Sequence, residues 1–574
     1  MNKLICGCIV AILLSSELAP GVHAAKPASD VLLSTMQREL ERAQSELKKQ
    51  DPAPYFLAYS VHDQSMSAAM AMQGSLVTSM ATRRRIGDVI MRVGSPALDN
   101  SHAENRQSAM GTMLLPLEDD TDAIARTLWR QTYLEYRRAA ESFSSVKSRT
   151  QVNATEEDTS PDFSQEKPQV STVPWTAAPT PDQRILEEMV RADSALLRKY
   201  PYIYQSAAYI TVERGRQYFI SSEGTRLTTS GGVVRLMILA QARAEDGMEL
   251  MRVETAQAES LDRLPSQTEM AARIEKMASD LKALREAPVA EPFTGPALLS
   301  GSAAAVFFHE VLGHRLEGQR QRGETEGQTF TKKVGQAILP TFLSVTDDPT
   351  QTTMNGTGLS GSYAFDDEGV PASKVELVVN GILKNFLMSR TPIKNFPNSN
   401  GHGRGEPGAM PVGRQGNLIV TSSQTASETE LRKRFIDEIK KQGKPYGLYF
   451  TDVQGGFTLT QRSLPQAFQV LPIMVWRVYP DGRPDELVRG IDLVGTPLTA
   501  IEHIILTGDK TAVFNGVCGA ESGSVPVSAA APAMLLNGIG VQKKAHGLDR
   551  PPILPPPGFD SAAPAAPAIS GGEQ

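Results

Sequence analysis

The sequence predicts an α+β protein in which N-terminal and central α/β regions precede a largely antiparallel β C-terminal domain. Helical and strand patterns alternate before residue 291, whereas hairpin signatures dominate after residue 375. The chain is 40% hydrophobic and 21% charged, which is ordinary for a folded protein. Its 574 residues suffice for two to four domains with sizeable cores.

The first 25 residues have the composition of a secretory signal peptide. A lysine near the start is followed by an apolar run over 4–14 and by the ending Val22-His23-Ala24, with cleavage expected after Ala24 or Ala25. The run is too short for a membrane span, and no other stretch is long and apolar enough. We therefore expect a periplasmic or secreted protein without a membrane span once residues 1–25 are removed.

Residues 30–145 are expected to form an N-terminal α/β domain. A first helix up to residue 49 has apolar positions at three-four spacing, strand-like segments fill 56–93, and 119–140 is again helical. Prolines then interrupt a polar stretch, so 146–181 is predicted to be a linker or an insertion.

Residues 182–291 are expected to form the central α/β region. A helix over 182–199 precedes strands within 207–242, and a second helix covers 268–284. The order predicts helices packed on a sheet.

Residues 292–546 are expected to form the β-rich C-terminal domain. Hairpins are predicted over 375–388, around the Asn380-Gly381 pair, and over 473–493, while a capping box opens a helix over 427–441. The remaining residues, 547–574, are rich in proline and alanine and are predicted to be disordered.

One helix of this domain carries ionisable groups inside an apolar sequence. Ser302 is a candidate N-cap, and the apolar run 303–308 leads into His309, Glu310 and His314. A helix that is apolar nearly all round is buried. Two imidazoles and a carboxylate are unusual there unless a metal or a cleft accommodates them.

The spacing of the two histidines differs from the zinc-peptidase pattern His-Glu-x-x-His, because His314 comes one residue later. Positions i and i+5 point roughly 140° apart on a regular α-helix. Two side chains aimed so differently cannot bind one tetrahedral ion. We therefore predict a widened, π-type turn between Glu310 and His314, eased by Gly313.

Cysteine usage supplies a third candidate ligand. Cys6 and Cys8 belong to the expected signal peptide, so the mature chain keeps only Cys518, within a glycine-flanked stretch predicted to be a loop. A lone cysteine in an exported protein is a free thiol, an intermolecular bridge, a metal ligand or simply a buried apolar residue. Beside His309 and His314, the ligand interpretation is favoured.

These residues together predict a catalytic zinc site. Three protein ligands, His309, His314 and Cys518, would leave a fourth position for water, and Glu310 would act as general base. His402, in a glycine-rich run, is a further candidate metal-binding or substrate-binding group or an ordinary loop histidine.

Several segments together resemble the TldD/PmbA family of zinc metallopeptidases, in the active, TldD-like branch that keeps the His-Glu-x-x-x-His helix. The resemblance is ordered over about 296–536 and looser over 30–290. The segments that carry it are 309–318 (HEVLGHRLEG), 365–369 (FDDEG), 380–384 (NGILK), 389–407 (SRTPIKNFPNSNGHGRGEP), Gly455-Gly456 and 518–527.

The resemblance implies a Zn²⁺-dependent peptidase that acts on unfolded or flexible polypeptides in an enclosed cavity, as a homodimer or a heterodimer with a family paralogue. It also implies that extended substrate pairs with a strand edge and that Arg404 faces a substrate carbonyl or carboxylate, unless Arg404 is a solvated surface residue. The alternative function is a non-catalytic peptide-binding or assembly subunit with a structural metal or none. A net charge of -6 argues against nucleic acid as the partner.

Overall fold

The computed structural model describes residues 30–102, 109–150, 158–173, 181–322, 325–464, 466–544, 554–557 and 559. The expected signal peptide and most of the expected tail lie outside these residues. Helices and large, mostly antiparallel sheets confirm the predicted mixed fold class. No helix within the described ranges combines the length and the apolar character that a membrane span requires.

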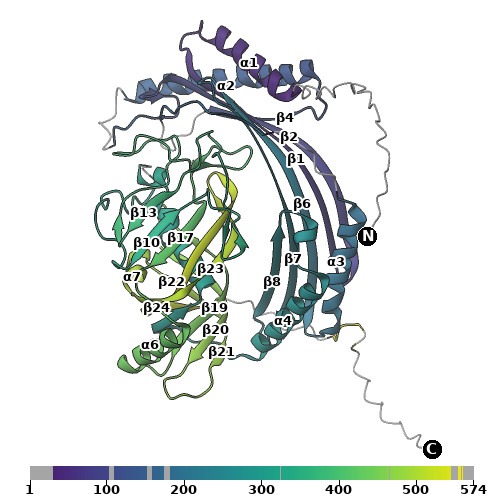
Figure 1. Cartoon of the computed structure of the whole chain (residues 1–574), viewed down its shortest axis with the longest axis vertical. Helices are drawn as coiled ribbons and strands as arrows, with labels where there is room; N and C mark the ends of the chain where they lie inside the picture. The colour runs from purple at the N-terminus through teal and green to yellow at the C-terminus, as the bar shows by residue number, and fades with distance from the viewer. Residues whose placement is uncertain are drawn as a thin grey trace, which may run out of the picture.

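Strands from the N-terminal and central regions join in one sheet, because β1 pairs with β6 in antiparallel register. Figure 1 shows that these long strands curve around the C-terminal domain. Eight strands from the described residues take part: β1 (Pro54–Met72), β2 (Ser75–Ser95), β3 (Leu98–Asp99), β4 (Ala109–Leu115), β5 (Val170–Thr172), β6 (Ile203–Ser221), β7 (Arg226–Arg243) and β8 (Glu249–Ala258).

Helices cover the two ends of this sheet and leave its middle bare. At one end, α1 (Val31–Leu47) and α2 (Thr121–Thr150) share a core with β1 and β2. At the other end, α3 (Gln183–Ala195) and α4 (Gln267–Glu286) share a second core with β6 and β7. Between these cores, residues 77–84 of β2 are exposed. The sheet thus has two separate cores that flank an uncovered central span.

The C-terminal domain is built on a second sheet, in which β9 pairs with both β19 and β24. The predicted hairpins are confirmed as β13–β14, with Asn380 and Gly381 both at positive φ, and β20–β21. Its twelve strands within the described residues are β9 (Phe293–Leu299), β10 (Leu343–Asp347), β13 (Val375–Val379), β14 (Ile382–Leu383), β17 (Asn417–Ser422), β18 (Thr425–Ala426), β19 (Gly447–Thr458), β20 (Phe468–Val478), β21 (Glu486–Val488), β22 (Ile491–Gly495), β23 (Ile504–Ala520) and β24 (Gly523–Lys543).

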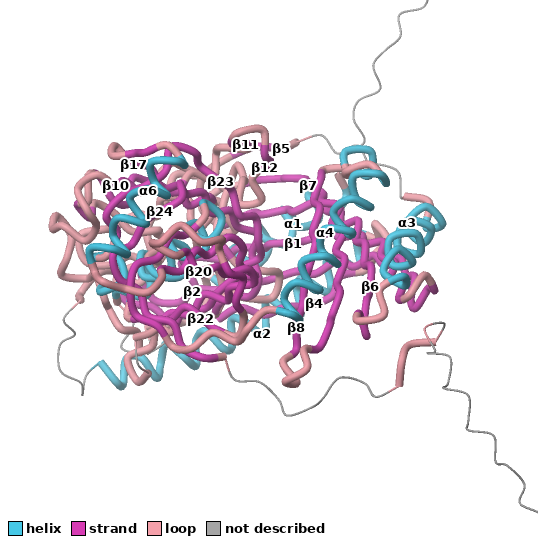
Figure 2. Tube along the Cα trace, turned by 90° about the horizontal axis from the view of Figure 1, so that it is seen from below, coloured by secondary structure: helices cyan, strands magenta, loops and turns pink. Residues whose placement is uncertain are grey.

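The two sheets meet at both ends of the arch, and Figure 2 shows the C-terminal domain beside the α3–α4 end. There, Arg252 of β8 pairs with Asp452 of β19. At the other end, part of the proline-rich segment packs between the regions. Phe163 lies between the guanidinium groups of Arg92 and Arg390, at 3.8 and 3.9 Å from its ring centroid. These two contacts hold the sheet over the C-terminal domain.

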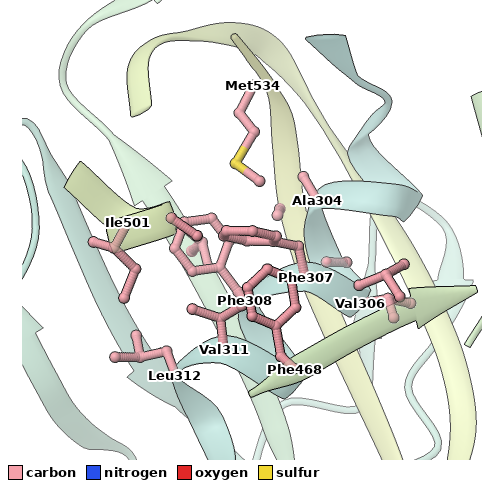
Figure 3. Packing of buried hydrophobic residues seen from close by; sticks show 14 of the residues in the cluster. Ala304, Val306, Phe307, Phe308, Val311, Leu312, Phe468, Ile501 and Met534 are labelled. Carbon is pink, nitrogen blue, oxygen red and sulfur yellow. The ribbon is translucent and has the colours of Figure 1, made fainter. Parts of the chain in front are cut away.

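Helix α5 (Gly301–Val311) runs through the core of the C-terminal domain and is buried nearly all round, as its apolar sequence predicts. Its N-cap is Ser300, whose hydroxyl accepts from the Ala303 amide at 3.3 Å, and not the expected Ser302. Figure 3 shows Phe307 and Phe308 packed with residues from other elements: Phe468 of β20, Met534 of β24 and Ile501 of α7 (Pro497–Glu502).

Candidate metal centre

The histidine pair meets through a break in the helix. The α-helix ends at Val311, and residues Gly313–Leu316 form a tighter 3₁₀ turn, η3. The predicted π-type widening is therefore wrong. The side chain of Gln415 occupies the place where a Cβ on Gly313 would lie, with Oε1 only 2.0 Å from that position, so this turn requires glycine. The break turns His314 back, and its ring centroid lies 4.9 Å from that of His309.

Cys518 reaches the same point from a strand. The predicted loop is wrong, because Cys518 lies near the end of β23 and is paired with Val525 of β24. Its Sγ lies 3.4 Å from His314 Nε2. The candidate ligand atoms of His309, His314 and Cys518 all lie within 4.8 Å of one another, and all three residues are buried.

The three candidate ligands are coupled electrostatically. Burial disfavours the thiolate of Cys518, but the charges of His314 and His309 lower its pKa to about 4. Burial likewise opposes the charged form of His309, yet the neighbouring Cys518 raises its pKa. Two imidazoles and a thiolate are donors that zinc prefers, so the residues fit this metal.

Glu310 points its carboxylate toward the same space. Its Oε2 lies 4.0 Å from His314 Nε2 and is a buried oxygen without a hydrogen-bond partner among the described residues. Burial raises the pKa of Glu310. Behind it, the backbone of Gly456 packs so closely that a Cβ there would lie 2.7 Å from Glu310 Cγ. The strand thus fixes the carboxylate from one side.

Two residues missed in the sequence hold the candidate ligands in place. Glu317 is fully buried, and its Oε1 accepts a hydrogen bond at 3.1 Å from His314 Nδ1, which leaves Nε2 free to face Cys518. Arg414 donates to the carbonyl of Cys518 at 2.7 Å and lies 3.7 Å from Glu317. Although burial opposes ionisation, His314 and nearby arginines lower the pKa of Glu317 to about 2. The signal in the sequence for this role was the position of Glu317, three residues after His314.

The other two candidate residues are not brought to the cluster. His402 is completely buried, with Nε2 at 3.3 Å from a carboxylate oxygen of Asp347. Arg404 is also buried, donates to the Gln415 carbonyl at 2.7 Å and lies over the ring of Tyr363. Neither residue lines the cavity that contains the histidines. Both make contacts within the C-terminal domain.

The cluster opens into a cavity of about 1530 Å³ under the arch of the first sheet. The C-terminal domain forms one side through η3, β19 and the end of β23, and β7, β8 and α4 form the other. The cavity exceeds the size of ordinary small-molecule pockets. An extended segment of polypeptide fits such a space.

Comparison with known proteins agrees with this chemistry. Residues 293–543 match the PmbA/TldA metallopeptidase C-terminal domain. The metalloprotease TldD homologs of Buchnera aphidicola and Haemophilus influenzae are 27% and 28% identical over 252 and 250 residues, which is 43% of this chain and 48% of each relative. The chain thus spans about half the length of these relatives. Residues 293–543 are thus similar to a metallopeptidase domain. The matches support the TldD/PmbA family in particular.

Solved structures show that the likeness in fold extends to the first sheet. A Thermotoga maritima protein named for modulation of a DNA gyrase aligns with a TM-score of 0.57 at 14% identity, covering 88% of this chain and 99% of its own. TldE from Thermococcus kodakarensis aligns with a TM-score of 0.54 at 14% identity, covering 88% and 100%. At this identity the alignments show the fold alone.

Proposed function

We propose that this protein is an exported zinc metallopeptidase that hydrolyses peptide bonds in unfolded or flexible polypeptides. One observation carries the proposal. Three buried donors from η3, α5 and β23 converge beside a buried carboxylate with an unpartnered oxygen, at the wall of a large cavity. A purely structural metal site would be closed and would not need such a carboxylate.

In the proposed reaction, the candidate ligands and Glu310 have separate roles. His309, His314 and Cys518 would hold the ion, which would supply Lewis acidity to a peptide carbonyl and to water. Glu310 would accept a proton at Oε2 from the attacking water and return it to the leaving amide nitrogen. Its raised pKa suits an acid–base group that must both take and give a proton.

The cavity suits an extended substrate. Gly455 and Gly456 of β19 line it beside Glu310, so a peptide backbone can approach closely there. Beyond residue 450, β19 pairs with β20 and no longer with β9, and a strand edge of this kind can pair with an extended peptide. A folded domain would not enter a space of about 1530 Å³.

Location and assembly form part of the same proposal. The secretory composition of residues 1–25 supports a periplasmic or secreted site of action. The fold shared with TldE supports a homodimer or a pair with a paralogue. A non-catalytic peptide-binding or assembly subunit is the alternative, and the unpartnered oxygen of Glu310 favours the enzyme.

The experiment combines metal analysis with one substitution. Purified protein is expected to contain about one zinc per chain and to cleave an unfolded polypeptide such as reduced, alkylated casein. Glu310→Gln should keep the zinc and lose hydrolysis by a factor on the order of 100 to 10,000. If zinc is bound but the wild type cleaves no unfolded polypeptide, the non-catalytic alternative replaces the proposal.

A further inference from the structure

One buried arginine beside the candidate metal centre is held without a counter-ion. Arg315 follows His314 in η3 and is only 2% exposed, yet it forms no ion pair with a described residue. Burial lowers its pKa to about 10, so the guanidinium group stays charged at neutral pH. A buried charge is costly unless it is hydrogen-bonded. The hydrogen bonds of Arg315 therefore offset the cost of its burial.

Two of these hydrogen bonds complete the broken end of helix α5. The Nη1 group donates to the carbonyls of Glu310 and Val311, at 3.0 and 3.4 Å. An α-helix that ends at Val311 leaves its last carbonyls without amide partners from a following turn. Arg315 thus supplies a donor to the backbone of the residue that carries the proposed general base.

The other hydrogen bonds reach the strand that packs against Glu310. Nη1 also donates to Thr458 Oγ1 at 2.7 Å, and Nη2 donates to the carbonyl of Leu459 at 3.1 Å. The Thr458 hydroxyl itself donates to the Ala467 carbonyl at 3.2 Å, so its oxygen is available as an acceptor for Arg315. One planar guanidinium group therefore joins the end of α5 to the end of β19.

This part of β19 has little support from the sheet. Beyond residue 450 the strand pairs with β20 and no longer with β9, and its register with β20 shifts repeatedly between residues 450 and 455. Gly456 nevertheless lies so close to Glu310 that a Cβ there would be 2.7 Å from Glu310 Cγ. Thr458 follows two residues later and is bonded to Arg315. That bond holds the strand against the side chain of Glu310.

We infer that Arg315 is a positioning residue for the proposed reaction, because it fixes the backbone of Glu310 relative to the strand behind its carboxylate. This role rests on the proposed function and adds to it a residue that does not line the cavity. Lysine would keep the positive charge, but its single nitrogen cannot reproduce the planar fork that bridges the helix end and the strand. Arg315→Lys therefore changes the geometry and not the charge.

Steady-state hydrolysis of a fluorogenic peptide taken from a cleaved site in casein separates positioning from a purely structural role. Arg315→Lys is expected to keep its zinc and to lower kcat about 10- to 100-fold, with KM within about two-fold of the wild-type value. The matched control is Arg489→Lys. Arg489 is also buried and donates to a carbonyl, that of Ala287 at 3.0 Å, but it lies outside the cavity lining. This control should unfold at a lower temperature and keep the wild-type kcat.

A second substitution tests the contact without changing the arginine. Thr458→Val keeps the shape of the side chain and removes the oxygen that accepts from Arg315. It should lower kcat about three- to ten-fold. In combination with Arg315→Lys, the loss should be smaller than the product of the two separate losses, because both substitutions break the same contact. If Arg315→Lys does not fold, Thr458→Val decides by itself, and an unchanged kcat then overturns the inference.

Amide hydrogen exchange provides a measurement that needs neither zinc nor hydrolysis. In metal-free protein, Arg315→Lys should raise the exchange rate over residues 453–460 by about 10-fold, because this span loses its tie to the helix. Arg489→Lys should leave the exchange rate of the same span unchanged.

The inference fails if Arg315→Lys keeps the wild-type kcat or changes KM alone, or if the two substitutions act as independent factors. It also fails if exchange over residues 453–460 is the same in Arg315→Lys and wild type. If exchange rises as expected but wild type hydrolyses no unfolded polypeptide, the tie between helix and strand stands and the peptidase assignment fails.

Discussion

The two regions around the cavity differ in what they contribute to the candidate site. The C-terminal domain supplies the three candidate ligands, the carboxylate and the residues that hold them, and it is the part that matches a metallopeptidase domain in sequence. The first sheet supplies a curved wall, and the solved structures share the fold of both regions at 14% identity over 88% of the chain. One region has fully buried polar side chains around the candidate ligands, and the other has an exposed central span.

Buried polar contacts explain the difference. Around the candidate ligands, Glu317 and Arg414 are fully buried. Glu317 accepts a hydrogen bond from His314, and Arg414 donates one to the carbonyl of Cys518. Removing one partner of a buried ion pair leaves an uncompensated charge, at a cost of about 3–5 kcal/mol. In the middle of the first sheet, residues 77–84 are exposed, and substitutions at such positions usually change stability by less than about 0.5 kcal/mol.

The largest effect is expected at Cys518. Replacing it with serine removes the thiolate and offers a hydroxyl that stays protonated, so zinc affinity should fall by at least about 100-fold and hydrolysis should be lost with it. Zinc content after dialysis against a weak chelator measures the loss. Serine is close to cysteine in size, so the metal-free fold should survive. Unchanged zinc stoichiometry would remove the thiol from the ligand set.

A backbone contact in the same region should matter nearly as much. In Gly456→Ala the new Cβ would lie 2.7 Å from Glu310 Cγ and 2.8 Å from the Gln469 carbonyl, so the carboxylate must move. A displacement of about 1 Å costs on the order of 100-fold in rate. Peptide hydrolysis should fall accordingly while zinc content stays unchanged. A variant with normal activity would show that the position of Glu310 is not set by this strand.

The candidate ligands could be selected from the sequence because that selection depends on residue types. His309, Glu310, His314 and Cys518 could be selected by their donor atoms and by the apolar helix that carries the first two. The hairpins at Asn380-Gly381 and at β20–β21 followed from turn chemistry and alternation.

Local geometry could be predicted less well from the sequence, because it depends on packing against residues that lie far away along the chain. The turn before His314 tightens because Gln415, about a hundred residues later, fills the space beside Gly313. The strand conformation of Cys518 depends on pairing with β24. His402 and Arg404 resembled site residues until their buried partners, Asp347 and the Gln415 carbonyl, were known.

Stability near the contact between the two regions should respond to pH through Glu368, whose Oε2 accepts a hydrogen bond from the Arg390 amide at 2.6 Å. Burial raises the pKa of this carboxyl group to about 7, above its usual value of 4.5. The folded state therefore keeps a proton that the unfolded state releases. The contribution of Glu368 to the free energy of unfolding is complete below the usual pKa and is lost as pH rises through about 7. The loss is at most about 3 kcal/mol. Glu368→Gln stays neutral and should lose less stability than wild type between pH 5.5 and 8.

Thermal unfolding of both proteins at the two pH values measures this difference. The neighbouring Asp366 also has a pKa raised by burial, so the variant should keep part of the pH dependence. Equal shifts in melting temperature for wild type and variant would show that Glu368 is ionised in the folded protein.

The smallest effect is expected at Gly231, the counterpart of Gly456 in the first sheet. A Cβ there would meet nothing within 4 Å, and the residue lies in the exposed middle of β7, outside the cavity lining. Gly231→Ala should therefore leave hydrolysis unchanged and raise the free energy of unfolding by about 0.4–1 kcal/mol, because alanine restricts the unfolded chain. Urea unfolding and peptide hydrolysis check both parts. A loss of activity in Gly231→Ala comparable to that expected for Gly456→Ala would contradict the interpretation that this span is not packed against other residues.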